Sequence, residues 1–371
     1  MAILIFGAMI AIHELGHFLV ARVFKVKINE FAIGMGPKLF SKKSKKSDIL
    51  YSLRAFPVGG YVNMEGENEA SDVDGSFSKK PAWQKLLISL AGPFMNIMLG
   101  FVLTFILVIG ARGENGEILL ASTTVNRFNA NAVSSQMLEL PDNSLTSVLL
   151  ADDRVVKVGN VSVHTGTELF YEISMQCTKV YEDIRIIDGQ KVHFNFTCVD
   201  LTVERNGEII TLKNVAFPAD SSSGVTVMGD CDFLVYAESA NFGSVMKHTW
   251  FRSLSSIKMV WDSLVGLFSG RFGIESLSGP IGTTEALTTV ARAGWYTLLY
   301  FVTVISMNLG VFNLLPILPL DGGHNVFYLY ELIARKPAPE KIQVALQVLG
   351  VVLLFGLMII VSIKDVIGLF G

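Results

Sequence analysis

The sequence has few charged residues, and this shortage excludes an ordinary soluble protein. Aspartate, glutamate, lysine and arginine make up 17% of the 371 residues, whereas 51% are hydrophobic. A soluble chain normally carries about a quarter charged residues, so the apolar excess needs either a very large core or a bilayer. The net charge is only −3 and there is no basic patch, so we expect no nucleic-acid partner.

Cysteine is also scarce, and its spacing excludes a cysteine-based metal site. Cys177, Cys198 and Cys231 lack the CxxC spacing that a zinc site built from cysteines would show. One disulfide among them is an open alternative, and it would leave an odd thiol.

Long apolar runs decide for a bilayer. About 20 apolar residues cross the hydrocarbon, and four runs are long enough: Met1 to Phe24, Leu86 to Ala111, Trp295 to Leu320 and Ile342 to Ile363. The first run lacks the basic start and the small-residue cleavage site of a secretory signal, so we expect it to be retained. The predicted fold class is a polytopic α-helical membrane protein with about four transmembrane helices.

The basic residues predict the orientation of these helices. Lysines are concentrated between the first two runs, and the positive-inside rule puts this loop in the cytoplasm. Segment 112–294 is then outside, and the short loop with Arg335, Lys336 and Lys341 is inside. The two inside loops are both basic, so they agree with each other.

The segments between the helices have β character. In the cytoplasmic loop 25–82, short β-prone runs bounded by glycine and proline predict a hairpin or small sheet beside the membrane. This hairpin is either a plain surface element or a strand edge that pairs with an extended peptide. Residues 112–220 predict a β-rich domain, in which Asn206-Gly207 marks a hairpin turn.

Residues 221–294 predict a linker followed by an amphipathic helix. From Trp250 to Gly270, apolar residues recur at three- and four-residue spacing. This helix either lies on the outer membrane face or packs on the β-rich domain, and both interpretations stay open. The predicted division of the chain is 1–24, 25–82, 83–111, 112–220, 221–294, 295–323 with the aspartate ligand, and 342–368.

The first apolar run contains an HExxH motif, His13-Glu14-Leu15-Gly16-His17. Residues four apart lie on one face of a helix, so both imidazoles can reach one zinc ion. Glu14 sits beside them and can take a proton from water. Each of these polar groups would cost several kcal/mol in lipid without a partner, and a metal provides one. The alternative is a pair of core histidines hydrogen-bonded to Glu14.

Asp321 is the candidate for the third zinc ligand. It follows the third apolar run, in a stretch where Pro316 and Pro319 interrupt the helix, and such breaks are tolerated only where a cavity or protein satisfies the backbone. At about 1.5 Å per residue, His13 lies about 18 Å along its span and Asn313 about 27 Å along the third, both from the outside. Asp321 can therefore fold back toward the histidines. The alternative is that it only caps a turn.

Asn308 and Asn313 lie in the same third run. Their carboxamides both donate and accept hydrogen bonds, so they can hold a substrate backbone or a developing oxyanion. Interhelical hydrogen bonding is the alternative role.

Taken together, these residues resemble the bacterial site-2 proteases of the regulator-of-sigma type, which are intramembrane zinc metalloproteases. The likeness covers nearly the whole chain. It includes His13 to His17, the loop from Phe31 to Pro37, Ala91 to Asn96, Ser278 to Gly282, and Asn308 to Gly323.

The resemblance implies a role for individual residues. It implies that His13, His17 and Asp321 bind one zinc ion per chain and that Glu14 is the catalytic base. Asn308 and Asn313 match family asparagines that handle substrate. Gly34 and Gly36 match a β element that enters the membrane and pairs with an unwound substrate.

The resemblance also implies partners and a location. The outer domain would be a PDZ-like α+β domain, although this chain has Asp152-Asp153 where Gly-Asp is usual and extra sequence at residues 175–198. The protein would lie in the bacterial cell membrane. It would cut single-span membrane proteins that a site-1-type protease has already trimmed, such as anti-sigma factors, or signal-peptide remnants. The rival hypotheses are a catalytically silent scaffold that binds peptides through its PDZ-like domain, and a metal transporter.

Overall fold

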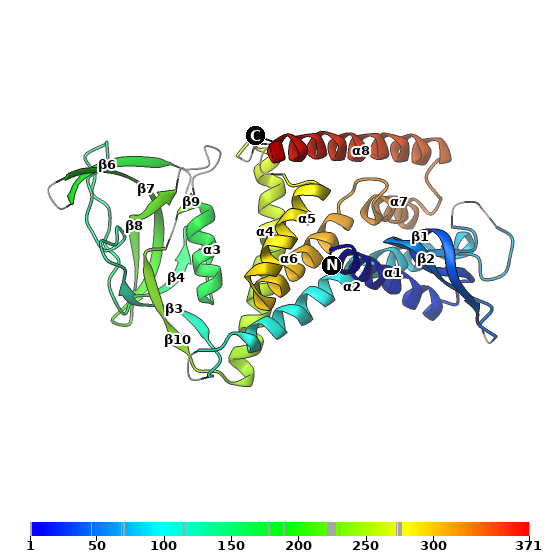
Figure 1. Cartoon of the computed structure of the whole chain (residues 1–371), viewed down its shortest axis with the longest axis horizontal. Helices are drawn as coiled ribbons and strands as arrows, with labels where there is room; N and C mark the ends of the chain where they lie inside the picture. Colours follow the sequence, from blue (N-terminus) through cyan, green and yellow to red (C-terminus); the bar gives the residue numbers. More distant parts are fainter. Residues whose placement is uncertain are drawn as a thin grey trace. The chain divides into compact units, whose positions relative to one another are not determined.

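The computed structural model describes residues 2–45, 47–67, 69, 71–113, 116–176, 179–187, 190–220, 228–229, 231–271, 273 and 277–370. The chain forms two compact units (Figure 1). Unit 1 consists of Met1–Leu103 and Leu277–Gly371, and unit 2 consists of Thr104–Ser276.

Unit 1 is helical, with one small sheet. Within the described residues, four helices are long and apolar enough to cross a membrane, which agrees with the four predicted spans. Their bounds are α1 Ala2–Val23, α2 Ala82–Gly110, α6 Trp295–Asn313 and α8 Glu340–Phe370, and the last turns of α2 belong to unit 2. Unit 1 also contains a short 3₁₀ helix, η1 Phe77–Lys79, and two shorter helices, α5 Pro280–Ala293 and α7 Asp321–Ala334.

The end of the third span differs from the expected boundary. We predicted one span over residues 295–323 with an interruption at Pro316 and Pro319, whereas the structure has two helices: α6 ends at Asn313 and α7 begins at Asp321. Pro316 and Pro319 lie in the interval, where each removes a backbone donor and fixes φ, so the helix cannot continue. The break makes Asp321 the first residue of a new helix instead of the end of an old one.

The predicted cytoplasmic hairpin is a sheet of two long strands, β1 Ile28–Lys43 and β2 Leu50–Met64. The first part of β1 pairs antiparallel with both ends of β2, so that Ile33 is opposite Gly60 on one side and Leu53 on the other. The second part of β1 then pairs with the beginning of β2. Apolar side chains including Ile28, Val62 and Phe18 pack this sheet against α1.

Unit 2 is built around one layer of strands, and the strand pairs described in it are all antiparallel. Its described strands form a sheet in the order β10-β3-β4-β7-β8-β9, with β5 paired to β4 and β6 paired to β7. The bounds are β3 Leu120–Phe128, β4 Arg154–Val158, β5 Val161–Ser162, β6 Val180–Ile187, β7 Gln190–Arg205, β8 Glu208–Asp220, β9 Met228–Gly229 and β10 Phe233–Glu238. Helix α3, Gly166–Gln176, contributes Leu169 and Ile173 to the core of the sheet. The predicted Asn206-Gly207 turn joins β7 to β8.

Two expected features of unit 2 are changed by the structure. Strand β10 pairs with β3 inside the sheet, although residues after 220 were assigned to a linker. The extra sequence at 175–198 contributes β6 and the first half of β7, which pair as a hairpin. Cys177 lies outside the described residues, so the disulfide alternative stays a prediction.

The predicted amphipathic helix is α4, Phe242–Phe268, and it packs on the β-rich domain. Tyr171 of α3 donates a hydrogen bond to Asp262 of α4 at 2.7 Å, and Lys258 of α4 pairs with the buried Glu172 of α3 at 2.9 Å. These contacts support the second of the two interpretations that the sequence left open.

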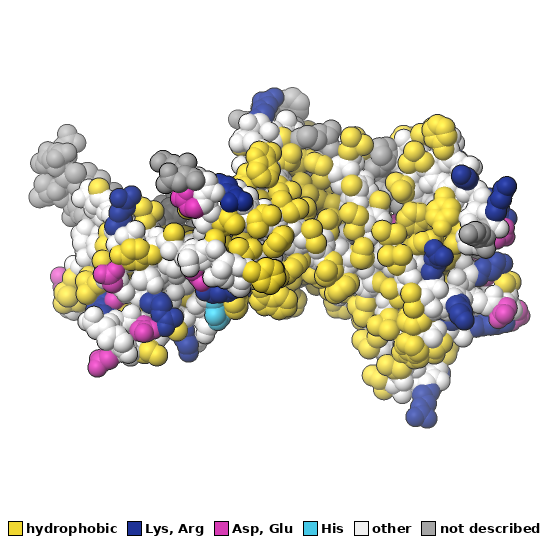
Figure 2. Space-filling view, turned by 90° about the horizontal axis from the view of Figure 1, so that it is seen from below, with side chains coloured by type: hydrophobic (Ala, Val, Ile, Leu, Met, Phe, Trp, Pro, Cys, Tyr) yellow, Lys and Arg dark blue, Asp and Glu magenta, His cyan; other side chains and the backbone are white. Residues whose placement is uncertain are grey.

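The outward faces of the helices are apolar. In Figure 2, hydrophobic side chains gather over the helices, whereas charged side chains are frequent over the sheet of unit 2. Leu353 and Ile360 of α8 have exposed fractions of 60% and 55%, which would be unfavourable in water for so long a helix. Lipid contact accounts for this surface, so the protein is a polytopic membrane protein.

Candidate metal centre

Three ligand atoms from two helices meet inside unit 1. His13 and His17 lie one turn apart on α1, and Asp321 opens α7. The Nε2 atoms of the two histidines are 3.2 Å apart, and Oδ2 of Asp321 lies 3.0 Å from His13 Nε2 and 3.4 Å from His17 Nε2. Both histidines are buried, and the Asp321 side chain is 24% exposed. The structure therefore brings together the three residues that the sequence analysis selected.

The spacing of these atoms fits a zinc ion. With bonds of about 2.0–2.1 Å and tetrahedral angles, two zinc ligands lie about 3.3–3.4 Å apart. All three measured separations are within a few tenths of an ångström of that value. Oδ2 of Asp321 is buried and accepts no well-directed hydrogen bond from the described residues. A cation between the three atoms would satisfy it.

Helix α7 is fixed at both ends against α2, and this fixes Asp321. Ser89 donates its hydroxyl to the backbone carbonyl of Asp321 at 3.3 Å. Lys85, one turn earlier on α2, forms a largely buried ion pair with Glu331 at 3.0 Å. Because Glu331 lies in the last turns of α7, the two contacts clamp the helix along its length.

Helix α2 also makes room for the imidazoles. A Cβ atom on Gly92 would lie 2.3 Å from His17 Nε2 and 2.7 Å from His13 Nε2, close to the position a metal would take. One turn earlier, the carbonyl of Ile88 lies 2.8 Å from His17 Nδ1. A carbonyl only accepts hydrogen bonds, so Nδ1 carries the proton and Nε2 keeps the lone pair that a metal needs.

Glu14 lies next to His13 on α1, and its side chain lies against strand β2. The contact between Glu14 and strand β2 is seen at Gly60. A Cβ atom on Gly60 would lie 3.2 Å from Glu14 Cγ, so the strand passes directly beside the glutamate. The sequence analysis expected the sheet near the membrane but did not place this strand beside Glu14.

The remaining predicted site residues are not joined to the metal centre by any hydrogen bond or ion pair among the described residues. The Asn313 amide donates to the carbonyl of Leu309 in its own helix at 2.9 Å, whereas Oδ1 of Asn308 is buried without a partner in the described part of the chain. Gly34 and Gly36 have φ values of +86° and +83° and bend β1 around Phe56 of β2. Their roles toward a substrate stay predictions.

The sequence analysis gave no role to Asn96, which is fully buried beside His13. Its amide nitrogen lies 3.2 Å from Nδ1 of that histidine. The sequence does contain a feature that indicates such a role. Gly92 and Asn96 are four residues apart on an apolar span and therefore share one helix face. An asparagine within a span usually faces other protein, but only the folded chain shows which group it meets.

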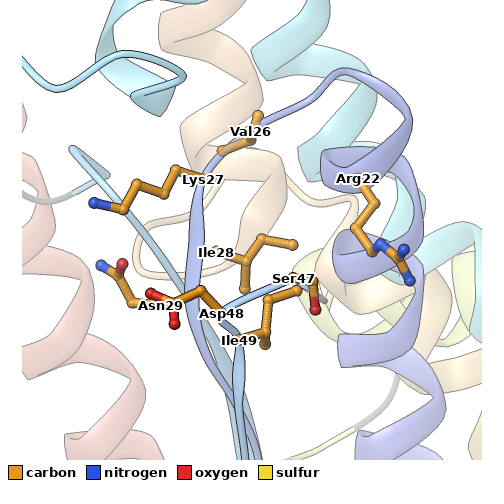
Figure 3. Close-up of a pocket in the computed structure, with 8 residues that line it drawn as sticks. All are labelled: Arg22, Val26, Lys27, Ile28, Asn29, Ser47, Asp48 and Ile49. Carbon is orange, nitrogen blue, oxygen red and sulfur yellow. The ribbon is translucent and has the colours of Figure 1, made fainter. Parts of the chain in front are cut away.

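A hollow is lined by residues of α1, the start of β1 and the turn before β2. Its volume is about 200 Å³. Figure 3 shows the residues that line it, which are Arg22, Val26, Lys27, Ile28, Asn29, Ser47, Asp48 and Ile49. Its lining mixes Arg22 and Lys27 with Asp48, and none of its residues belongs to the metal centre. We therefore assign no catalytic role to this cavity.

Comparison with known proteins identifies the family. The sequence matches the profile of peptidase family M50 over residues 1–357. The chain belongs to peptidase family M50, the site-2 protease family. Among its relatives are a protein of Fusobacterium nucleatum, 33% identical over 100% of this chain and 98% of the relative, and one of Clostridium acetobutylicum, 33% identical over 99% and 96%. RasP of Shouchella clausii is 26% identical over 100% of this chain and 98% of its own.

The names of all three relatives contain the words zinc metalloprotease. This M50 protein is accordingly a zinc metalloprotease of the membrane, and its cofactor is zinc. The resemblance stated from the motifs is confirmed at the level of family, enzyme class and cofactor. The metal-transporter hypothesis has no support from any of these relatives.

Proposed function

We propose that the protein hydrolyses peptide bonds within the membrane-spanning segments of single-span proteins. The observation that carries this proposal is the position of the metal centre: His13 and His17 sit in the middle of the apolar helix α1. A soluble peptidase would have no reason to bury such groups in a span, where each costs several kcal/mol unless it is partnered.

We propose that His13, His17 and Asp321 hold the zinc ion and that Glu14 is the general base. Zinc, when bound, lowers the pKa of a coordinated water to about 7 and polarises the scissile carbonyl. Glu14 accepts a proton from the attacking water and gives it to the leaving amine. Glu14 follows His13 directly on α1, and strand β2 lies against its side chain at Gly60, which supports this role.

The substrate must unwind before it can be cut, because a helix hides its carbonyls in its own hydrogen bonds. The β1–β2 sheet supplies replacement partners for the unwound segment by adding it as a strand. The passage of β2 beside Glu14 supports this step, since a strand added there would lie next to the base. Gly34 and Gly36 shape the loop that receives the substrate, and Asn308 and Asn313 hold its backbone.

The charge pattern supports an orientation of the protein in the membrane, and the proposed role of unit 2 leads to a substrate class. The lysine-rich loop 25–82 lies in the cytoplasm, unit 2 lies outside, and the metal centre faces the cytoplasmic half of the bilayer. Unit 2 acts as a PDZ-like domain that screens substrates by size, so that only proteins already trimmed by a site-1-type protease are admitted. Pre-cleaved anti-sigma factors and signal-peptide remnants fit this description.

The test is cleavage of a model single-span substrate by the purified protein in detergent. Wild type is compared with Glu14→Gln and with a chelator-treated sample that is then reloaded with zinc. We expect Glu14→Gln to retain zinc and to lose activity by about 10²–10⁴-fold, the usual contribution of a general base. We expect the chelated sample to be inactive and to recover when zinc is returned.

A measurement of Glu14→Gln in cells separates the enzyme from the scaffold hypothesis. A scaffold that only binds peptides through unit 2 would be unaffected by Glu14→Gln, because Glu14 lies in unit 1. If cells that carry Glu14→Gln behave in every measured respect like cells that carry the wild-type protein, proteolysis is excluded as the function. Glu69, an acidic residue of the loop, serves as the control position, because its change to glutamine should leave cleavage intact.

A further inference from the structure

Helix α2 carries three groups on one face that all meet the metal centre. Ile88, Gly92 and Asn96 follow one another at four-residue spacing, so they lie on one stripe of the helix. The Ile88 carbonyl meets His17, Gly92 leaves the space between the imidazoles, and the Asn96 side chain meets His13. The two histidines thus have separate outer partners on one rigid element.

The partner of His13 decides which of its nitrogens is free. If Nε2 of His13 is to bind zinc, Nδ1 must carry the ring proton, and a protonated Nδ1 needs an acceptor. The side chain of Asn96 is the group in contact with that nitrogen, at 3.2 Å. Its amide oxygen is buried and has no hydrogen-bond partner among the described residues. A half-turn of the carboxamide exchanges its oxygen and nitrogen without changing its shape.

We propose that Asn96 is the positioning residue for His13, accepting the Nδ1 proton through its side-chain oxygen and so fixing the imidazole with Nε2 toward zinc. This proposal rests on the proposed function, because it takes His13 as a zinc ligand. It makes the carboxamide of Asn96 the counterpart of the Ile88 carbonyl at His17. Each histidine of the HExxH motif then has one acceptor on α2.

The packing of α2 against α6 holds Asn96 in place. Ser306 of α6 donates its hydroxyl to the backbone carbonyl of Asn96 at 2.8 Å, and both residues are fully buried. Gly310, one turn further along α6, comes so close that a Cβ atom would lie 3.0 Å from the carbonyl of Pro93. A side chain held this tightly at its backbone fixes the direction of its hydrogen bond, which is what an outer partner of a metal ligand requires.

The direction of the hydrogen bond gives a sharp test. Asn96→Asp keeps an acceptor and removes the donor, whereas Asn96→Leu keeps the branching at Cγ and removes both. Zinc affinity of the full-length protein in detergent is measured by competition with a chromophoric chelator. Loss of an outer partner typically weakens metal binding by about 10–100-fold. We expect this loss for Asn96→Leu and an affinity at or above wild type for Asn96→Asp.

Spectroscopy and stability separate positioning from folding. The visible spectrum of the cobalt-substituted protein reports the geometry around the metal and should shift in Asn96→Leu but keep its tetrahedral intensity in Asn96→Asp. The thermal unfolding midpoint of the metal-free proteins provides the folding control. Ser306→Ala is the matched control variant, because it removes a buried hydrogen bond at the backbone of Asn96 without touching the imidazole. Because Ser306→Ala keeps both the carboxamide of Asn96 and the imidazole of His13, its zinc affinity should fall by much less than that of Asn96→Leu.

Three outcomes would overturn the proposal. Equal weakening in Asn96→Asp and Asn96→Leu would mean that Asn96 donates to His13 instead of accepting. Unchanged zinc affinity and cobalt spectrum in Asn96→Leu would mean that it positions nothing. Equal weakening in Ser306→Ala and Asn96→Leu would assign the effect to packing. If Asn96→Leu does not fold, the zinc affinity of Asn96→Asp is compared with that of wild type. Weaker zinc binding in Asn96→Asp would contradict an acceptor role for Asn96.

One more variant keeps the two proposals apart. His13→Ala should weaken zinc binding by more than any Asn96 variant, because it removes a ligand. If His13→Ala leaves zinc affinity unchanged, the proposed metal centre itself is wrong. If His13→Ala abolishes binding while Asn96→Leu does not weaken it, only the role of Asn96 is wrong.

Discussion

At the scale of single residues, the proposed metal centre requires three ligands and also a position between them that no side chain fills. The three ligand atoms enclose a position within about 2 Å of each, which is a zinc–nitrogen or zinc–oxygen bond length. Gly92 borders that position, and its lack of a side chain leaves it open. A ligand set alone would not have predicted this, because the glycine belongs to a different helix from all three ligands.

Gly92→Ala should abolish zinc binding while leaving the fold largely intact. The added Cβ would lie 2.3 Å from His17 Nε2, so at least one imidazole must turn away. Alanine is otherwise well suited to a helix. The zinc content of the purified protein, determined by elemental analysis, checks this.

Gly100→Ala is the control for that variant. Gly100 lies on the same helix, and the three atoms nearest to a Cβ there all belong to the side chain of Met307, at 2.7–2.8 Å. The unbranched side chain of Met307 must shift in that variant, whereas the imidazole rings must shift in Gly92→Ala. We expect full zinc content in Gly100→Ala, and equal zinc content in the two variants would show that Gly92 does not border the metal.

At the scale of elements, the short helix α7 is as important as the spans. It presents Asp321 from its first residue, and the Lys85–Glu331 pair ties its far end to α2. The two side chains are only 10% and 20% exposed, so the pair is shielded from water. Removing one partner of a buried pair leaves the other charge uncompensated, which costs about 3–5 kcal/mol.

Lys85→Met should therefore destabilise the protein more than the double variant Lys85→Met, Glu331→Leu. The single variant leaves Glu331 without its partner, whereas the double variant replaces the whole pair by apolar side chains, which is often nearly neutral. Thermal unfolding in detergent measures both. A double variant that is less stable than the single variant would show that the pair is not a buried clamp.

The β1–β2 sheet carries its own pH dependence through Glu30. Burial raises the pKa of this carboxyl, but hydrogen bonds from Ser52 and Arg54 outweigh burial and lower the pKa to about 2. A carboxyl whose folded pKa is depressed stabilises the fold above its unfolded pKa of about 4.5 and loses that contribution as the pH falls toward 2. The sheet should therefore loosen in acid.

Glu30→Gln should weaken the sheet by about 1–3 kcal/mol at pH 7 and remove most of its loosening between pH 4.5 and 2.5. Hydrogen exchange of the amides in residues 28–64, corrected for the intrinsic pH dependence of exchange, measures this. Lys38→Met is the control, because Lys38 is an exposed partner of Glu30 and should contribute little. An acid response in Glu30→Gln as large as in wild type would contradict the account.

At the scale of the whole molecule, the features that follow from apolar length or helical periodicity were predictable from sequence. The four spans follow from apolar length, and the pairing of His13 with His17 follows from helical periodicity. The sequence also placed Asp321 at the depth of the two histidines, and the structure brings the three residues together, while their role as ligands stays a proposal. These inferences succeed because each depends on local sequence and on the fixed thickness of the bilayer.

The missed features all depend on contacts between segments far apart in the chain. Strand β10 joins β3, more than 100 residues earlier, so the boundary of the β-rich domain was drawn too early. Helix α7 was not expected, because its stability comes from packing on α2 instead of from its own length. Asn96 was not assigned a role for the same reason: its partner is an imidazole of another helix.

The most direct test of intramembrane proteolysis is the position of the cut. A single-span substrate is reconstituted with the full-length protein in liposomes, and the product termini are identified by mass spectrometry. We predict one or a few adjacent cuts inside the apolar span of the substrate, in its cytoplasmic half. We predict no cuts when the protein carries Glu14→Gln. Cuts confined to the soluble flanks of the substrate, or the same products with Glu14→Gln, would contradict it.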